Sequence, residues 1–211
     1  MISRADTHDD VTEFERAWND PRHTRAVQPP TDINQVLRQR YRTGEPLVFT
    51  RAMLWDLEQR KARDPGVYIP HVVQVDSDRS WALPPAADGA ELLARFSQPR
   101  LWLLPDQYGL VLERAHLDHD RQAVTFTGHR TLAGPDGRTL VATSRQPLFH
   151  VEHAVGGSEE GPLNLWRIVH LTDAPDQQLT ALFSRIWASP WLPEFVEIYI
   201  QRDLHIVLHR R

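Results

Sequence analysis

The sequence of 211 residues has no cysteine, and Lys61 is the only lysine among its 24 basic residues. The absence of cysteine excludes disulfides, thiolate metal sites, iron–sulfur clusters and a cysteine nucleophile. Two interpretations of the missing lysines remain open. A GC-rich genome favours arginine codons, which is the simpler one, and arginine also makes bidentate contacts to carboxylates and phosphates that lysine does not make.

Net charge and long apolar runs are also scarce. The formal net charge is −4, whereas a nucleic-acid partner usually shows as a basic patch or stripe. Residues 1–10 lack the basic and apolar regions of a signal peptide, and no apolar run approaches the ~20 residues of a membrane span. We therefore expect a cytoplasmic protein without a nucleic-acid or membrane partner.

The residues that are present indicate one α+β domain over residues 1–211. Hydrophobic residues make up 41% of the chain and charged residues 25%, both ordinary for a globular protein. Residues 1–30 are predicted to form a helix and a linker, residues 109–171 an antiparallel meander, and residues 173–209 the closing helices. A homodimer is compatible with these features, which do not decide the oligomeric state.

Hydrophobic spacing and end signals place the elements outside the meander. Val11, Phe14 and Trp18 recur at i, i+3 and i+7, which predicts a helix over residues 9–19. The other predicted elements are a linker over 22–30, helices that begin at Asp32 and at Thr50, a strand over 67–75, a helix after the capping-box pattern from Asp88 to Glu91, a helix capped by Asp173, and a helix over 192–209.

The meander contains four strand-like segments, separated by turn signals at residues 118–120, 134–137 and 156–162. Hairpin turns fix the register, and the register decides which side chains share a face. With turns centred at these positions, Thr125 lies opposite Arg114 and Arg145, and Trp166 lies opposite Val151.

These registers give the two faces of the sheet different compositions. One face mixes polar and apolar side chains, namely Arg114, His116, Thr125, Thr127, His129, Thr143, Arg145 and His170 among Leu112, Val141, Phe149, Trp166 and Ile168. The other face is mostly apolar and resembles a core, with Glu113, Gln146 and Arg167 as exceptions. The mixed face is either the solvated side of a half-buried sheet or the wall of a ligand cavity, where a few polar groups stand among apolar ones.

If the mixed face lines a cavity, three of its residues are candidates for acid–base chemistry. A histidine such as His129 can move protons near neutral pH, and Arg145 and Arg114 can stabilise an enolate or a carboxylate. The predicted substrate contacts are Trp166, Phe149, Thr127, Thr143 and His170. Each of these side chains also has a structural interpretation, as a cross-strand hydrogen-bond or ion-pair partner, which is favoured for any single one.

Histidine pairs at ligand spacing raise the question of a metal. His205 and His209 are four residues apart on the predicted last helix, and His150 and Glu152 share a strand face beside His153. No HExxH motif accompanies the first pair, and no third ligand is singled out for the second. The G-x-S-x-G elbow, the Walker A loop and the dinucleotide fingerprint are also absent. We predict neither a metal nor a cofactor.

The order of elements is similar to the helix-grip fold of START and Bet v 1-like proteins, in which an antiparallel sheet curves around a long C-terminal helix and an apolar cavity. The C-terminal segment, with Asn-Leu-Trp-Arg-Ile-Val-His-Leu-Thr before a helix and Tyr-Ile-Gln-Arg-Asp-Leu-His-Ile-Val after it, also resembles the end of Rieske oxygenase catalytic domains, which share that fold. A Rieske cluster needs two cysteine ligands, so that activity is not carried over. Here, extra N-terminal helices are expected in place of the usual opening strand.

The leading hypothesis is a small-molecule pocket protein, a cofactor-independent cyclase or isomerase acting on an apolar or polyketide-like intermediate. It expects a cavity bordered by His129, Arg145 and Trp166. One alternative is an acyl thioesterase or dehydratase of hot-dog type, whose sheet would wrap the helix over 50–63 instead of the one over 192–209. The other alternative is a non-catalytic protein that binds a ligand or a partner.

Overall fold

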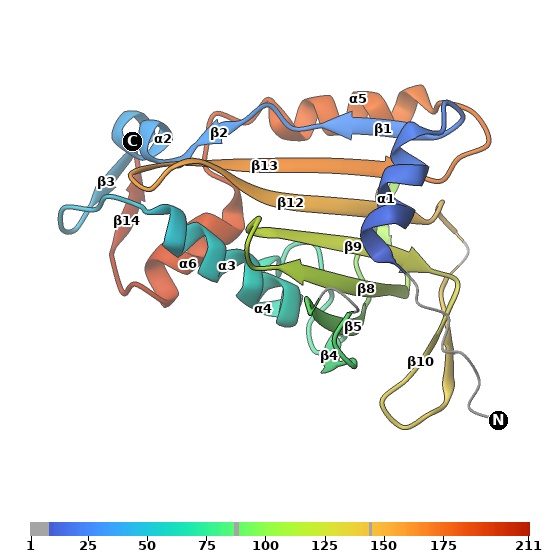
Figure 1. The fold of residues 1–211 in the computed structure, drawn as a ribbon. Helices are drawn as coiled ribbons and strands as arrows, with labels where there is room; N and C mark the ends of the chain where they lie inside the picture. The colour runs from blue at the N-terminus through green and yellow to red at the C-terminus, as the bar shows by residue number, and fades with distance from the viewer. Residues whose placement is uncertain (1–8, 87–88, 144) are drawn as a thin grey trace.

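The fold is seen in a computed structural model that describes residues 9–86, 89–143 and 145–211, and it is built on an eight-stranded antiparallel sheet. The strands of this sheet are β1 (Thr24–Val27), β2 (Thr31–Asp32), β4 (Arg79–Ala82), β5 (Glu91–Ser97), β8 (Val111–Asp118), β9 (Ala123–His129), β12 (Phe149–Ser158) and β13 (Gly161–His170). Their spatial order is β1-β13-β12-β9-β8-β5-β4, and β2 also pairs with β13. The opening and the last strand of the sheet are therefore neighbours (Figure 1).

Six helices and three small ladders complete the described part of the chain. The helices are α1 (Asp10–Asn19), α2 (Ile33–Arg40), α3 (Arg51–Arg63), α4 (Pro65–Tyr68), α5 (Gln177–Trp187) and α6 (Glu194–Arg202). The ladders pair β3 (Tyr41–Thr43) with β14 (Leu208–Arg210), β6 (Arg100–Leu101) with β7 (Leu104–Tyr108), and β10 (Thr131–Ala133) with β11 (Thr139–Val141). In the described ranges, every helix is too short or too polar to cross a membrane. The predicted α+β class is confirmed.

The helices cover both faces of the sheet. α3 contacts β9, β12 and β13, and α5 contacts β1, whereas α1 crosses β8, β9 and β12 (Figure 1). Neighbouring residues of one strand point to opposite faces. The ring of Phe126 of β9 lies under the Arg95 guanidinium, which donates to backbone carbonyls of α3. The adjacent Thr127 donates a hydrogen bond to Asp10 of α1. We call these two sides the α3 face and the α1 face.

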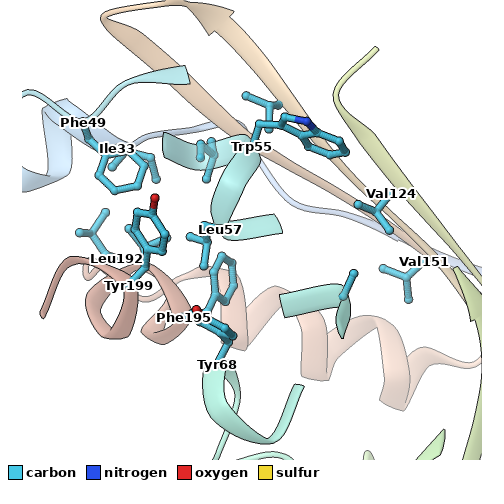
Figure 2. Close-up of a cluster of buried hydrophobic side chains, with 14 of the residues drawn as sticks. Ile33, Phe49, Trp55, Leu57, Tyr68, Val124, Val151, Leu192, Phe195 and Tyr199 are labelled. Atoms are coloured by element: carbon cyan, nitrogen blue, oxygen red, sulfur yellow. The ribbon is translucent and has the colours of Figure 1, made fainter. Parts of the chain in front are cut away.

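The main core lies between the α3 face and the helices on it. Leu54 and Leu57 of α3 are fully buried, and they belong to one cluster with Phe195 and Tyr199 of α6 (Figure 2). A smaller cluster lies on the α1 face, where Phe14 of α1 packs with Val169 of β13. Each face of the sheet therefore has its own apolar contact layer.

The first helices begin where the sequence predicts. Asp9 caps α1 by accepting from the backbone N–H groups of Val11 and Thr12, Asp32 caps α2, and Thr50 caps α3. These side chains satisfy backbone donors that lack partners inside the helix. Hydrophobic spacing and cap chemistry together were sufficient here.

Two expected elements in the first half of the chain are corrected. The predicted linker over 22–30 contains β1, which pairs with β13 and supplies the opening strand that the helices were expected to replace. The predicted helix after Glu91 is instead β5; Asp88 of its capping box lies outside the described residues. Leu92 and Leu93 are both buried because β5 is covered on both faces, and such an apolar run does not distinguish strand from helix.

Further elements differ from expectation. The predicted strand over 67–75 is the one-turn helix α4 and a loop whose Val73 forms a single bridge with Pro99. The predicted last helix ends at Arg202 and not at residue 209. His205 has a φ of 58°, a left-handed conformation that stops a helix, and the chain returns as β14. In the penultimate helix the cap is Asp176 and not Asp173.

Candidate functional site

Strand register decides which of the predicted site residues can meet. In the first hairpin Arg114 lies opposite Thr127 and not Thr125, and in the last hairpin Trp166 lies opposite His153 and not Val151. Both are shifts of two residues, which leave every side chain on its expected face because the side-chain period of a strand is two. These two errors alone would not have changed the predicted faces.

The pairing between the two hairpins does change them. Thr125 was expected to face Arg145, but β10 and β11 form a separate ladder and β9 pairs with β12, with Phe126 opposite Val151. Phe149, Trp166 and Ile168 therefore share the α3 face with Phe126. The side chains of Arg114, Thr127 and His129 lie on the α1 face, so the single mixed face predicted from the sequence is two faces.

The polar residues on the α1 face are engaged with α1. Arg114 Nη2 lies 3.1 Å from Asp10 Oδ2, and the Thr127 hydroxyl donates to Asp10 Oδ1 at 2.6 Å. His129 Nε2 lies 3.1 Å from the Thr127 hydroxyl. The structure thus gathers three predicted site residues around one buried carboxylate of α1, away from Trp166.

The remaining predicted residues lie in two places: the connection between β9 and β12, and the α3 face of the sheet. Arg145 is exposed and donates to the side-chain carbonyl of Gln107, and the Thr143 hydroxyl accepts the backbone N–H of Leu110 at 2.8 Å. Phe149 and Trp166 line a cavity on the α3 face. His129 and Arg145 do not border it, so the expectation of a cavity enclosed by His129, Arg145 and Trp166 is met only at Trp166.

The cavity has a volume of about 140 Å³ and lies between the α3 face, the loop after α4 and α6. Apolar side chains make most of its wall, including Val72, Phe126, Phe149, Val151, Trp166 and Phe195. The charged or titratable side chains on the wall are Lys61, Arg95, Glu113 and His153. An apolar wall with a few polar groups is the usual composition of a ligand site.

Lys61 is at the centre of a buried polar cluster on that wall. Its Nζ lies 2.6 Å from Glu58 Oε2 and 3.1 Å from His153 Nδ1, and 3.7 Å above the Phe195 ring. The Asn164 amide donates to the other oxygen of Glu58 at 3.2 Å. Glu58 and Asn164 are fully buried, and Lys61 is 4% exposed. The His153 ring stacks on Trp166, with ring centroids 5.2 Å apart.

A second buried ion pair adjoins this cluster. Arg95 of β5 lies directly opposite Glu113 of β8, and its Nε donates to Glu113 Oε2 at 2.8 Å. Its Nη1 also donates to the backbone carbonyls of Lys61 and Ala62. These are carbonyls of the last turn of α3, where a cation is favourable. Arg95 thereby ties the end of α3 that carries Lys61 to the sheet.

Burial sets the charge state of the cluster. Burial lowers the pKa of Lys61, the nearby Arg95 charge lowers it further, and the Glu58 carboxylate opposes both effects. Burial also lowers the pKa of His153 far below its usual range, and the charges of Lys61 and Arg95 act in the same direction. The imidazole is therefore neutral, and its Nδ1 accepts the hydrogen bond from Lys61.

The sequence contains signals for this cluster. Leu54, Leu57, Glu58 and Lys61 follow i, i+3, i+4, i+7 spacing, so the lone lysine and a glutamate fall within the apolar stripe of α3. Glu113 was noted as an exception on the apolar face of the meander. Charged residues at core positions are rarely buried without a partner, which pointed to this face.

His170, another predicted contact, is fully buried beside the cavity. Its ring lies 5.8 Å from Phe149 and 5.4 Å from Phe183, measured between centroids. Among the described residues neither of its ring nitrogens has a hydrogen-bond partner, and burial lowers its pKa to about 4. It is a neutral imidazole inside an aromatic cluster.

The metal candidates are separated in space. His205 lies in the turn after α6 and His209 lies in β14, so the two do not share one helix face. His150 Nε2 lies 3.6 Å from Glu13 of α1, while Glu152 pairs with Arg167, and His153 points to the other face. In the described ranges no group of three or more histidine, aspartate or glutamate side chains is placed to hold a metal ion.

No family model matches the sequence, and no curated protein matches it. Solved structures with similar folds include the Zhui aromatase/cyclase from a Streptomyces species, with 8% identity and a TM-score of 0.44, covering 85% of this chain and 94% of that one. A START superfamily protein from Mycobacterium smegmatis has 7% identity and a TM-score of 0.47, covering 79% and 98%. The major latex-like protein 151 from Panax ginseng has 10% identity and a TM-score of 0.36, covering 80% and 91%.

One of these similar structures is a START superfamily protein, and the sequence resembles the fold of START proteins. At such low identity and TM-score, no residue role is transferred from them. The hot-dog alternative placed the helix over 50–63 inside the sheet, in place of the helix over 192–209. α3 does contact β9, β12 and β13, but it shares that side with α5 and α6 (Figure 1).

Proposed function

We propose that the protein binds a small, neutral, largely apolar molecule in the α3-face cavity and that Lys61, held by Glu58 and His153, performs acid–base chemistry on it. The observation that carries this proposal is the placement of a buried lysine, a neutral imidazole and a carboxylate on the wall of an apolar cavity. Perturbed titratable groups that converge in a pocket are typical of catalytic sites.

The charges of the wall favour a neutral ligand. Lys61 is paired with Glu58, and Arg95 is paired with Glu113, so an added carboxylate would find no uncompensated cation and would be costly to bury. Trp102 and Trp166 both line the cavity, and their buried indole N–H groups have no hydrogen-bond partner among the described residues. Indole N–H groups only donate, which favours a ligand that accepts, such as a ketone or an aldehyde.

The cavity volume limits the size of the ligand. About 140 Å³ is close to the ~150 Å³ of an engineered cavity that holds benzene. Drug-sized ligands need roughly 300–1,000 Å³. The proposal is therefore a substrate with one ring or a short chain, and a polyketide-like intermediate with several rings would need a larger site.

Acid–base chemistry follows from the pair of neighbouring groups. A lysine with a lowered pKa exchanges protons more readily near neutral pH than an ordinary lysine. Neutral His153 accepts a hydrogen bond from Lys61 and orients the amine, and the Glu58 carboxylate, 2.6 Å from Nζ, can take up a proton that Lys61 releases. Proton removal beside a carbonyl, as an isomerase or a cyclase requires, is the reaction type that these groups support.

The test uses acetophenone, a neutral single-ring ketone, with benzoate as its charged analogue. We expect acetophenone to quench the fluorescence of Trp102 and Trp166 with at least about tenfold higher affinity than benzoate, since 1.4 kcal/mol corresponds to a factor of ten. Exchange of its methyl protons for deuterium, followed by NMR, measures proton removal. Lys61→Met should slow this exchange at least about tenfold while acetophenone still binds.

The control is the same substitution inside and outside the cavity. Val151→Phe fills the cavity and should abolish acetophenone binding, whereas Val141→Phe, at a residue 65% exposed, should not change it. Equal binding by both variants would refute the cavity as the site. Exchange that is unaffected in Lys61→Met, with binding retained, would leave a binding protein without this chemistry.

A further inference from the structure

The most unusual side chain of the cavity is Lys61, the only lysine of the chain. We propose that its amine condenses with an aldehyde or ketone ligand to form an imine, so that the protein holds its carbonyl ligand covalently. This inference rests on the proposed function, because it requires the ligand to enter the α3-face cavity. It restricts the ligand to an aldehyde or a ketone, and it adds a covalent step.

The surroundings of Lys61 hold the amine at the cavity wall. Glu58 approaches Nζ at 2.6 Å, His153 at 3.1 Å and the Phe195 ring at 3.7 Å. Glu58 is a positioning residue: it sits one helical turn before Lys61 on α3, and Asn164 fixes its second oxygen. One carboxylate that can accept a proton and one imidazole that accepts a hydrogen bond therefore lie beside an amine that also lines the cavity.

These contacts allow the amine to lose a proton without releasing it to water. Transfer of one proton from the Lys61 ammonium to the Glu58 carboxylate, 2.6 Å away, leaves a neutral amine with a free electron pair. Burial and the charge of Arg95 both lower the pKa of Lys61, and a lysine that is desolvated or placed beside another cation is activated as a nucleophile in this way.

The step balances without any further reactant. The neutral amine attacks the carbonyl carbon, one nitrogen–carbon bond forms, and the oxygen is protonated to give a carbinolamine. Loss of the second nitrogen proton then accompanies cleavage of the remaining carbon–oxygen bond. The products are the imine and one molecule of water, which carries the ligand oxygen and the two amine protons, and nothing is oxidised or reduced.

Stability alone does not account for a lysine at this position. Replacing a buried ion pair by well-packed apolar residues is often neutral or stabilising. The stripe of α3 around Lys61 is otherwise built from residues such as Leu54 and Leu57 that are fully buried. An amine that lines a cavity, beside a carboxylate that can accept its proton, is the arrangement that imine chemistry needs.

The experiment traps the imine by reduction. The protein is incubated with benzaldehyde and sodium cyanoborohydride near neutral pH, and intact mass and peptide mapping locate the added benzyl group. We expect one benzyl group on Lys61, formed in a reaction that saturates with benzaldehyde and is blocked by excess acetophenone. Because Lys61 is the only lysine, the background is limited to the α-amino group at the start of the expressed chain.

Three variants complete the test. K61R should lose the internal label, and the double variant K61R/R138K, which moves the lysine to a side chain 87% exposed, should be labelled at least about tenfold more slowly than the native protein. Val151→Phe keeps Lys61 but fills the cavity, so its label should also fall at least about tenfold. This variant keeps the test decisive if K61R fails to fold, which circular dichroism would show.

The outcomes separate the two proposals. A label confined to the α-amino group, with acetophenone still bound by the native protein and not by Val151→Phe, overturns the imine and leaves the proposed function standing. If the native protein does not bind acetophenone, or if Val151→Phe binds it equally well, both proposals are overturned. If the exposed lysine of K61R/R138K is labelled as fast as Lys61 is in the native protein, the imine is also overturned, because Lys61 would then show only ordinary amine reactivity.

Discussion

The two faces of the sheet both bury charged side chains, but in different surroundings. On the α1 face, Asp10 receives hydrogen bonds from Arg114 and Thr127, and an amphipathic helix closes over them. On the α3 face, Lys61 and Glu58 form a pair that borders the cavity. One cluster is covered by a helix, and the other adjoins the cavity in which we propose that a ligand binds.

The difference shows that buried polar residues alone do not identify a functional site. Arg167 on the α1 face stacks over Phe14 and Trp18 of α1 while it pairs with Glu15 and Glu152, so it connects helix and sheet. Its partners are all supplied by the fold. Around Lys61 the polar groups are also paired, but Lys61 and His153 line the cavity as well.

The largest expected effect on stability is at Glu58. Glu58→Ala leaves the Lys61 ammonium buried without its carboxylate, and breaking a buried pair in this way typically costs about 3–5 kcal/mol. Urea unfolding measures the loss. The matched control is Glu45→Ala at an exposed glutamate, for which we expect a change within about 0.5 kcal/mol.

A double variant sharpens this result. Glu58→Leu with Lys61→Met removes both charges together, and we expect it to recover most of the stability lost in Glu58→Ala, since an apolar replacement of a buried pair is often neutral. It should also lose the Lys61 label. A loss below about 1 kcal/mol in Glu58→Ala would contradict a buried ion pair at this position.

The sequence predicted where the first three helices begin because the signals for a helix start are local. The caps at Asp9, Asp32 and Thr50 and the spacing of apolar residues on the helices concern neighbours along the chain. Strand β1 was missed because Thr24–Val27 carries no pattern of its own and becomes a strand only through pairing with β13. Pairing of that kind depends on residues far away in the sequence.

The candidate site could be predicted only in part for the same reason. Trp166 and Phe149 were expected at a cavity and line it. The bond between Asp10 and Thr127 joins residues 117 positions apart, so nothing near Thr127 shows that a helix covers it. Lys61 and His153 meet across 92 positions. Lys61 was visible as an oddity of composition, but its partner was not.

Acid should weaken the protein through the α3 face more than through the α1 face. His170 binds its proton only near pH 4 in the folded protein, whereas a histidine in the unfolded chain binds it near pH 6.5. Between these values the unfolded chain holds more protons, so stability falls as the pH falls. We expect a contribution of about 2–3 kcal/mol to be lost between about pH 7 and pH 4.5.

The measurement is the free energy of unfolding at both pH values. His170→Phe, placed among Trp102, Phe149 and Phe183, should flatten the dependence by that amount. On the α1 face, burial also lowers the pKa of His150, but the Glu13 charge opposes the shift, so His150→Gln should flatten it less. The reverse order of the two variants would contradict the dominant effect of burial at His170, which the charge of Asp176 opposes only in part.

The smallest effect is the one that isolates the α1 face. Asp10→Asn removes the charge that pairs with Arg114 and weakens the hydrogen bond from Thr127, and a hydrogen bond to a charged group contributes about 1.5–3 kcal/mol. We expect a loss of about 2 kcal/mol in unfolding free energy. The acetophenone affinity should stay within about twofold of the native protein, a much smaller change than the tenfold that corresponds to 1.4 kcal/mol.

Because Asp10 and Lys61 act on opposite faces of the sheet, their stability effects should add. If Asp10→Asn abolished acetophenone binding while the protein stayed folded, the ligand would have to occupy the α1 face, and the residues first predicted there, His129 and Arg114, would replace Lys61 as the groups to test.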